Sequence, residues 1–302
     1  MNSEVKITEP LIADAECFDV IIIGAGLSGI GTAVRLQRDC PDRSFVLLER
    51  RDAIGGTWDL FRYPGIRSDS DMHTLGYDFK PWEAEKTIAD GPSILSYVNE
   101  TADEYRISDH IRFRQKLVSA DWCSERGQWQ LSVETLEGIR HYRCGVLMMC
   151  AGYYSYEQGY EPEFEGKSNF RGEWIHPQFW PDSVEYEDKK VVVIGSGATA
   201  MTLVPNMSRK AAHVTMLQRS PTYVISRPSV DGLANWLRRY LPPQLAYNIV
   251  RWRNTLWQQW MYRLTRVAPG IVKRSLLKKV REEIGGLVDI EKHFTPSYNP
   301  WD

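Results

Sequence analysis

The chain has 302 residues, of which 43% are hydrophobic and 25% are charged, and its formal net charge is −2. This length is enough for two domains of about 150 residues, each with its own core. The five cysteines form no Cys-x-x-Cys pair and do not cluster with histidines at zinc-ligand spacing. Composition therefore gives no support for a disulfide framework, a metal site or dithiol redox chemistry.

The chain has no sequence feature of a membrane-spanning or secreted protein. No run reaches the roughly 18 apolar residues that span a bilayer, and the longest candidate is 146–154. The first ten residues, MNSEVKITEP, lack a basic start followed by an apolar block, so they do not form a secretion signal. We expect a cytoplasmic protein.

The first pattern is a strand, a glycine-rich turn and a helix. A β-branched run at 18–23 meets Gly24-Ala-Gly-Leu-Ser-Gly29, and 27–38 places apolar residues at helical spacing. In a dinucleotide-binding loop Gly24 allows the turn, Gly26 lets the backbone approach a pyrophosphate, and Gly29 lets the helix pack on the strand. An ordinary turn is the alternative.

An acidic residue stands where such a loop needs one. A second strand at 44–48 ends at Glu49, 25 residues after Gly24. A carboxylate at this distance can accept hydrogen bonds from both ribose hydroxyls of an adenosine. Together with the strand and the helix, Glu49 favours nucleotide binding over an ordinary turn.

The next segments are less regular. Residues 50–80 show no sustained period and predict a long, functional loop. A helix capped by Ser93 is expected to run to about Arg106. Residues 111–143 predict a β-meander with breaks at Gly127 and Gly138, and 146–150 predict a buried strand.

After an aromatic, acidic linker at 153–188, the strand-turn-helix pattern returns. The run 191–194 meets Gly195-Ser-Gly-Ala-Thr-Ala200, and a helix follows that Pro205 should kink or shorten. The strand 213–217 leads to Arg219, 24 residues after Gly195. An arginine at this position suits the 2′-phosphate of NADP, so we expect NADP rather than NAD. A solvated surface arginine is the alternative.

The last part of the chain is basic and rich in tryptophan. Residues 232–281 contain eleven Lys or Arg and no Asp or Glu, which leaves a charge of −13 on the rest of the chain. A helical insertion over the active site, a patch for anionic membranes and a nucleic-acid surface are the competing interpretations. No nucleic-acid motif is present, so we favour the insertion, with weak peripheral membrane contact as the secondary interpretation.

The connector between the two loops carries the most specific motif. The residues Phe170, Gly172, His176, Trp180 and Pro181 match all five positions of Phe-x-Gly-x-x-x-His-x-x-x-Trp-Pro. This pattern resembles the fingerprint of Baeyer-Villiger monooxygenases, a class of flavin-dependent monooxygenases. The stretches GGTWDLFRYPGIRSDSDM and VVIGSGATA are most similar to the ethionamide-activating branch of that family.

The resemblance implies an α/β fold with two Rossmann-like domains, for FAD and NADP, and a helical insertion in the second. The implied domains are 1–152 for FAD, 153–188 as the linker, 189–230 for NADP, and 231–302 as the insertion. NADPH would reduce the flavin, and O2 would then give a C4a-peroxyflavin. That oxidant would insert oxygen into a ketone, forming an ester or lactone, or would oxygenate the sulfur of a thioether or thioamide.

The resemblance also assigns cofactor-binding residues. Those expected to hold FAD are Gly24, Gly26, Ser28, Gly29, Glu49, Gly56, Thr57, Trp58, Asp59, Leu60, Asp69 and the backbone of Val118. Those expected to hold NADP are Arg67, Ser68, Gly195, Ser196, Gly197, Ala198, Thr199, Ala200, Met201, Arg219 and Ser220. Asp69 is the expected catalytic residue, with helix N-capping as its structural alternative. For His176 and Trp180 the alternative to a role in domain motion is packing.

One family feature lies outside this sequence. In the family an active-site arginine follows a stretch similar to Tyr298-Asn-Pro-Trp-Asp302, where the sequence ends. The resemblance therefore implies a chain that lacks this arginine and the C-terminal part of the FAD domain. The remaining alternatives are an N-hydroxylating flavin monooxygenase and a non-catalytic nucleotide-binding or membrane-surface module.

Overall fold

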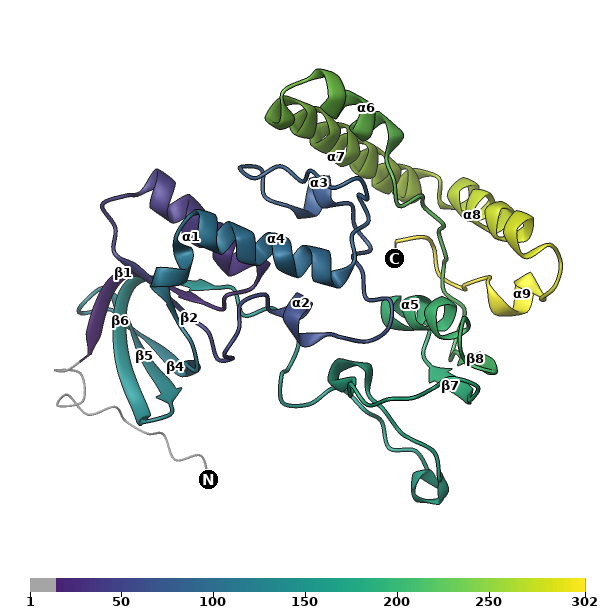
Figure 1. The fold of residues 1–302 in the computed structure, drawn as a ribbon, viewed down its shortest axis with the longest axis horizontal. Helices are drawn as coiled ribbons and strands as arrows, with labels where there is room; N and C mark the ends of the chain where they lie inside the picture. Colours follow the sequence, from purple (N-terminus) through teal and green to yellow (C-terminus); the bar gives the residue numbers. More distant parts are fainter. Residues whose placement is uncertain (1–14, 302) are drawn as a thin grey trace. The chain divides into compact units, whose positions relative to one another are not determined.

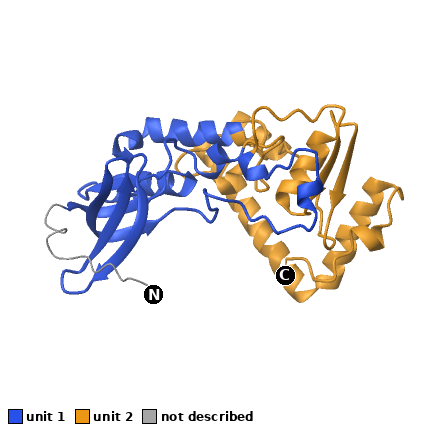
Figure 2. Ribbon diagram, turned by 90° about the horizontal axis from the view of Figure 1, so that it is seen from below, with its two compact units in different colours: residues 1–61, 92–179 blue, residues 62–91, 180–302 orange. Residues whose placement is uncertain are grey.

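A computed structural model describes residues 15–301, and they form two compact units (Figure 2). The first unit contains the chain up to Phe61 together with 92–179, and the second contains 62–91 together with the chain from Trp180 onward. The segment 62–91 thus belongs to the second unit, although the sequence places it in a first domain of 1–152. The linker predicted at 153–188 is divided between the units. The prediction that residues 1–10 do not form a secretion signal concerns a segment outside the described residues.

A six-stranded sheet organises the first unit (Figure 1). Its strands are β1 Glu16–Ile23, β2 Phe45–Leu48, β3 Ile111–Arg112, β4 Lys116–Cys123, β5 Gln128–Thr135 and β6 Gly138–Met149. Their order is β3-β2-β1-β6-β5-β4. Strands β3, β2, β1 and β6 run parallel, and β4, β5 and β6 form an antiparallel meander with the predicted glycine breaks. Residues 111–112, predicted as part of the meander, instead form β3 and pair in parallel with β2.

The helices of this unit include the two that the sequence predicts, but Ser93 does not cap the second of them, because that helix begins at Gly91. They are α1 Leu27–Asp39, α2 Thr57–Leu60 and α4 Gly91–Glu104, with short 3-10 helices at Ile107–His110, Lys167–Asn169 and Pro177–Phe179. Helix α1 packs on β1 and β2 through the fully buried Ile30 and Val34. The β-branched residues of β1 and β2 are buried because this helix covers one face of the sheet and the meander core lies on the other.

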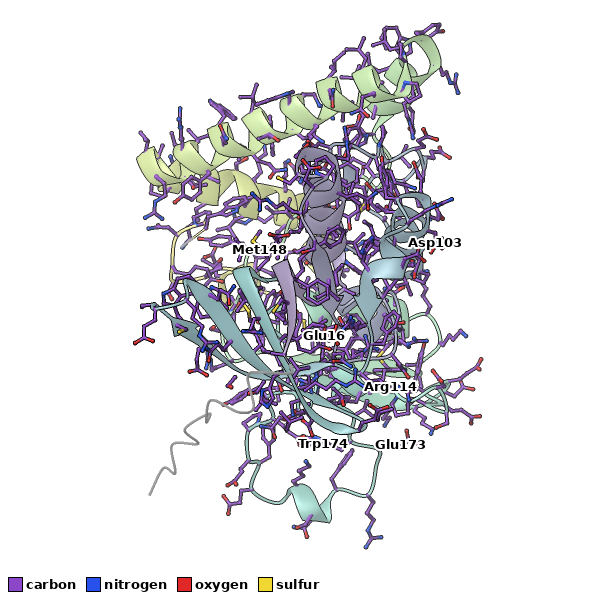
Figure 3. All side chains as sticks on the ribbon, turned by 90° about the vertical axis from the view of Figure 1, so that its left-hand side faces the viewer. Glu16, Asp103, Arg114, Met148, Glu173 and Trp174 are labelled. Atoms are coloured by element: carbon purple, nitrogen blue, oxygen red, sulfur yellow. The ribbon has the colours of Figure 1, made fainter. Side chains whose placement is uncertain are left out.

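The separate, buried strand predicted at 146–150 is wrong in two respects, because residues 146–149 are the end of the continuous strand β6 and are largely exposed. Val146, Met148 and Met149 of β6 are 49%, 39% and 61% exposed, and Met148 is labelled in Figure 3. Their partners Val20 and Ile22 on β1 are buried. The physical reason is that helix α1 packs on β1 and β2, whereas the exposed residues lie on the neighbouring strand β6. An apolar run in the sequence does not show how far across a sheet the covering helix extends.

The second unit contains a parallel pair, β7 Lys190–Ile194 and β8 His213–Leu217. Its helices are α3 Met72–Leu75, α5 Ala198–Met207, α6 Gly232–Tyr240, α7 Pro243–Val267, α8 Pro269–Ile284 and α9 Ile290–His293. Helix α5 includes Pro205 and ends two residues later. The predicted loop at 50–80 is less irregular than expected, because it contains the one-turn helices α2 and α3.

Among residues 15–301, no helix is both long enough and apolar enough to cross a bilayer. The longest one, α7, has 25 residues and carries several arginines along its length. The tryptophan-rich region is helical, as the sequence predicts.

Candidate dinucleotide-binding sites

Steric constraints fix the glycines of the first loop. Gly24 has φ +103°, and its N–H donates to the Leu48 carbonyl oxygen at 2.9 Å. A Cβ on Gly24 would lie 2.6 Å from the Cys150 carbonyl oxygen, and a Cβ on Gly29 would lie 1.9 Å from the Gly24 carbonyl oxygen. Larger residues would therefore force the turn and the α1–β1 packing apart.

The middle glycine of the loop, Gly26, leaves the first turn of α1 without a side-chain cap. Gly26 is the N-cap of α1 and provides no side-chain acceptor, and the first turn contains no acidic residue. A Cβ on Gly26 would lie 3.5 Å from the Cα of Gly56, and Gly55 N–H donates to the Ala25 carbonyl oxygen at 3.0 Å. The predicted residues Gly56 and Thr57 thus lie beside the loop, at the positive end of the helix dipole.

Glu49 is aimed at this loop by the backbone. Its side chain is only 3% exposed, and its Oε2 accepts from Ala25 N–H at 2.8 Å. Its Oε1 accepts from Arg51 N–H at 2.9 Å. Each carboxylate oxygen can accept a further hydrogen bond, so the fixed carboxylate retains capacity for ribose hydroxyls.

The sequence interpretation missed a charged cluster beside Glu49. Arg51 Nη2 pairs with Asp59 Oδ2 at 2.5 Å, and Arg51 Nη1 donates to the Gly56 carbonyl oxygen at 3.3 Å. The Arg51 guanidinium also lies 5.5 Å from the centre of the Tyr156 ring, whose pKa burial raises. Asp59, assigned to FAD by resemblance, is held by this arginine. The adjacent arginines directly after Glu49 were the available sequence signal.

Val118 lies at a β-bulge. The register of β4 against β5 shifts between Leu117 and Ser119, and Val118 has no partner in that ladder. Its side chain is 57% exposed. A bulge leaves backbone groups outside the strand ladder, which suits the backbone contact that the family resemblance assigns to Val118.

The second loop repeats the first in its backbone geometry. Gly195 has φ +129°, and its N–H donates to the Leu217 carbonyl oxygen at 2.8 Å, as Gly24 does to Leu48. Gly197 is the N-cap of α5 and has no side-chain cap. A Cβ on Gly195 or Gly197 would meet nothing within 4 Å in the described chain. The backbone here faces open space, as a phosphate-binding loop requires.

Charge distinguishes the two loops. Arg219 lies two residues after the end of β8 and is exposed, whereas Glu49 directly follows β2 and is buried. Next to it, the Ser220 carbonyl oxygen accepts from Ser196 Oγ at 3.5 Å. This hydrogen bond ties Ser220 to the loop at Gly195.

The segment 62–91 packs on the helix of the second loop. Tyr63 is 8% exposed; burial raises the pKa of its hydroxyl, and a hydrogen bond with Thr199 opposes that shift. Gly65 has φ +79°, and a Cβ there would lie 2.0 Å from Asn206 Nδ2. Tyr63-Pro64-Gly65 thus docks on α5, beside the predicted NADP residues.

Arg67, Ser68 and Asp69 follow on the same segment. Arg67 forms an isolated antiparallel bridge with Asp90, and Ser68 is 4% exposed, with its Oγ donating to the Ser70 carbonyl oxygen at 2.7 Å. Asp69 is exposed, and its charge adds to the raised pKa of Tyr63. The capping alternative for Asp69 is wrong, because Asp71 is the residue that caps α3.

The fingerprint segment is fixed locally around two glycines. A Cβ on Gly172 would lie 2.5 Å from Phe170 Cζ, and a Cβ on Gly159 would lie 2.2 Å from His176 Cε1. Trp174, labelled in Figure 3, forms ring contacts with Phe164 and Phe170 at 5.4 and 6.2 Å. Gln178, which the sequence interpretation missed, is 4% exposed.

The chain passes from the first unit to the second inside this fingerprint, between Phe179 and Trp180. His176 Nδ1 accepts from Gln178 N–H at 3.2 Å on the first-unit side. On the second-unit side, Trp180 contacts the Tyr186 ring at 6.5 Å. The five fingerprint residues are therefore divided between the two units.

The chain is similar to known proteins in sequence and in fold. The flavin-binding monooxygenase-like family matches residues 18–252. The chain is 51% identical over 288 residues to the FAD-containing monooxygenase EthA of Mycolicibacterium smegmatis, covering 95% of this chain and 58% of that protein. It is 49% identical over 286 residues to the probable FAD-binding monooxygenase AlmA of Acinetobacter baylyi, covering 94% and 57%.

Among solved structures, cyclohexanone monooxygenase from Rhodococcus sp. Phi1 bound to NADP+ superposes with a TM-score of 0.63 and 27% identity, covering 74% of this chain and 43% of that one. The chain belongs to the flavin-binding monooxygenase-like family. It spans rather less than three fifths of the length of these curated relatives.

Proposed function

We propose that the chain forms the FAD- and NADP-binding part of an NADPH- and O2-dependent flavin monooxygenase of the Baeyer-Villiger type. The observation that carries this proposal is the pair of equivalent strand-glycine-helix loops, followed by a buried Glu49 in one and an exposed Arg219 in the other. The similarity of the chain to FAD-containing monooxygenases and to a cyclohexanone monooxygenase bound to NADP+ supports the proposal.

The first loop suits FAD. Gly26 leaves the start of α1 without a side-chain cap, so backbone N–H groups and the helix dipole can face a pyrophosphate. The Glu49 carboxylate, fixed by two backbone N–H groups, would accept hydrogen bonds from the ribose. The bulge at Val118 would offer backbone groups to another part of the cofactor.

The second loop suits NADPH. The space in front of Gly195 and Gly197 admits a pyrophosphate to the start of α5, and Arg219 would bind the 2′-phosphate through charge-assisted hydrogen bonds. Thr199 is already held by Tyr63. The loop that carries Arg67, Ser68 and Asp69 would therefore stay beside the nicotinamide cofactor.

When bound, FAD would take up hydride from NADPH and activate O2 for transfer to a ketone or to the sulfur of a thioether or thioamide. The chain's own contribution is to bind, orient and exclude water. We propose that Asp69, exposed on a loop anchored to α5, acts close to the two cofactors.

We further propose that the fingerprint segment acts as a joint. It lies where the chain crosses between units, and its local contacts differ on the two sides of that crossing. A segment held firmly on each side can transmit domain motion without touching the substrate.

The proposal is tested by flavin reduction without oxygen. The chain is loaded with FAD and mixed with NADPH or NADH, and the absorbance of oxidised flavin is followed. We expect NADPH to bleach the flavin faster than NADH. If the chain binds FAD but neither NADPH nor NADH reduces the bound flavin, the activity proposed for this chain is refuted.

A further inference from the structure

The long helix α7 has a polar stripe that faces the rest of its unit. Gln244, Tyr247, Arg251, Asn254 and Gln258 recur at spacings of three and four residues, so they share one helix face. All five donate hydrogen bonds to residues 71–78. Gln244 donates to the Asp78 carbonyl oxygen, Tyr247 to that of Met72, and Arg251 to those of His73 and Gly76. Asn254 and Gln258 donate to the Asp71 carboxylate. Figure 1 shows α3, within that segment, lying beside α7.

The opposite face of α7 is apolar and exposed. Its residues also recur at three- and four-residue spacing, and they are Leu245, Ile249, Trp252, Leu256 and Trp260. Their exposed fractions lie between 42% and 65%. We call them the outer stripe. Helix α7 buries Ala246, Tyr247 and Val250 but leaves this longer apolar stripe exposed. We call this orientation inverted, because an ordinary surface helix buries its apolar stripe.

Hydrogen bonds maintain this inversion. Arg251 Nη1 lies 2.8 Å from each of the His73 and Gly76 carbonyl oxygens, and Asn254 Nδ2 lies 2.9 Å from Asp71 Oδ1. Rotating α7 to bury the outer stripe would break all of these bonds. An exposed apolar stripe that is held outward in this way is typical of an interaction surface.

The charge around the outer stripe indicates its partner. Helices α6 and α7 contain six arginines and no acidic residue, and Arg239 and Arg263 are exposed. Trp236 and Tyr240 on α6 are also exposed, and their rings lie 5.2 Å apart. Tryptophans beside arginines on an apolar helix face suit the headgroup region of an anionic bilayer.

We propose that the outer stripe, with the exposed aromatic and arginine side chains of α6, docks on an anionic lipid surface. The helices lie in the interface, with Trp252 and Trp260 inserted among the headgroups. A second copy of the chain is disfavoured as the partner, because a two-fold contact would bring arginines against arginines. This surface shares no residue with either nucleotide loop.

Vesicle co-sedimentation tests the proposal. The probes are phosphatidylcholine vesicles with and without phosphatidylglycerol, at low and moderate salt. We expect the unsubstituted chain to bind only the anionic vesicles. The double variant Trp252→Gln/Trp260→Gln should bind them at least about tenfold more weakly. Each of Arg239→Gln and Arg263→Gln should bind them about fivefold more weakly. Trp122→Gln/Arg126→Gln, which removes an exposed tryptophan and arginine from the first unit, is the matched control and should bind normally.

Three outcomes would overturn the proposal. They are no binding of the unsubstituted chain to either vesicle, equal binding to both, and undiminished binding of the outer-stripe variant. Light scattering provides a separate readout. If Trp252→Gln/Trp260→Gln converts a dimer into a monomer, the outer stripe binds a second copy instead of lipid.

Discussion

Two residues of opposite charge follow the second strand of the parallel pair in the two loops. Glu49 comes directly after its strand and Arg219 comes one residue later, after Gln218; in both loops the glycine at the end of the first strand donates to the last residue of the second strand. Glu49 is buried and held by backbone N–H groups, whereas Arg219 is exposed. We infer that the first position accepts hydrogen bonds from a ribose and the second binds a phosphate.

The Arg219→Ala variant tests this inference. We expect NADPH binding to weaken by about 2 kcal/mol, roughly thirtyfold, with little effect on NADH, which has no 2′-phosphate. Calorimetric titration of both nucleotides measures the difference. Arg209→Ala, an exposed arginine just after α5, is the control. Equal losses for NADPH and NADH would show that Arg219 does not contact the phosphate.

A buried histidine makes stability depend on pH. His73 is 1% exposed, and within the described chain its Nδ1 has no hydrogen-bond partner. Burial lowers its pKa; the charges of Asp71 and Asp231 oppose this shift, and those of Arg238 and Arg253 reinforce it. The unfolded chain therefore binds a proton more readily than the folded chain does.

This difference predicts acid destabilisation. Above an unfolded pKa of about 6.5, His73 is neutral in both states and contributes no pH dependence. As the pH falls below that value, we expect the free energy of unfolding to decrease, with a slope of up to about 1.4 kcal/mol per pH unit. His73→Gln should flatten the dependence, and the exposed control His213→Gln should not. Identical pH profiles for all three proteins would contradict the assignment.

At the scale of elements, α7 holds the segment that carries Asp69 near the second loop. Its polar stripe contacts 71–78, and the same segment is tied to Ser229 through the N–H groups of Thr87 and Ile88. The order of α3 therefore depends on helices more than 150 residues further along the chain.

We predict that Arg251→Ala loosens α3. Losing two charge-assisted bonds to backbone should lower the free energy of unfolding by about 2 to 3 kcal/mol, and the amides of Leu75 and Gly76 should exchange faster. Hydrogen exchange and denaturant unfolding measure the two effects. Arg263→Ala, on the exposed side of α7, should change neither. Equal effects of Arg251→Ala and Arg263→Ala would show that the Arg251 hydrogen bonds do not hold α3 in place.

Local periodicity was sufficient to predict most elements. The strands before both glycine loops, helix α1 and the meander were predicted correctly, because alternation and helical spacing depend on neighbouring residues. The inverted orientation of α7 was not predicted. A stripe of Gln, Arg and Asn at helical spacing resembles a solvated face, and only its partners in 71–78 show that it faces inward.

At the scale of the whole molecule, the chain crosses between its two units three times, at Phe61/Arg62, Gly91/Pro92 and Phe179/Trp180. The last crossing lies in the fingerprint, where the sequence predicted a connector. The first two could not be predicted, because the contacts of 62–91 with α5 and α7 join residues far apart in the chain. The bridge between Lys86 and Val230, which lies between these two helices in the sequence, is a further long-range contact of this segment.

The central claim is that the two loops bind different dinucleotides at separate sites. Calorimetric titration of the chain with FAD, followed by titration of the FAD-saturated chain with NADPH, tests this most directly. We predict one site for each nucleotide, with NADPH binding retained when FAD is saturating. Displacement of FAD by NADPH, or loss of NADPH binding in the FAD-saturated chain, would contradict the two-site account.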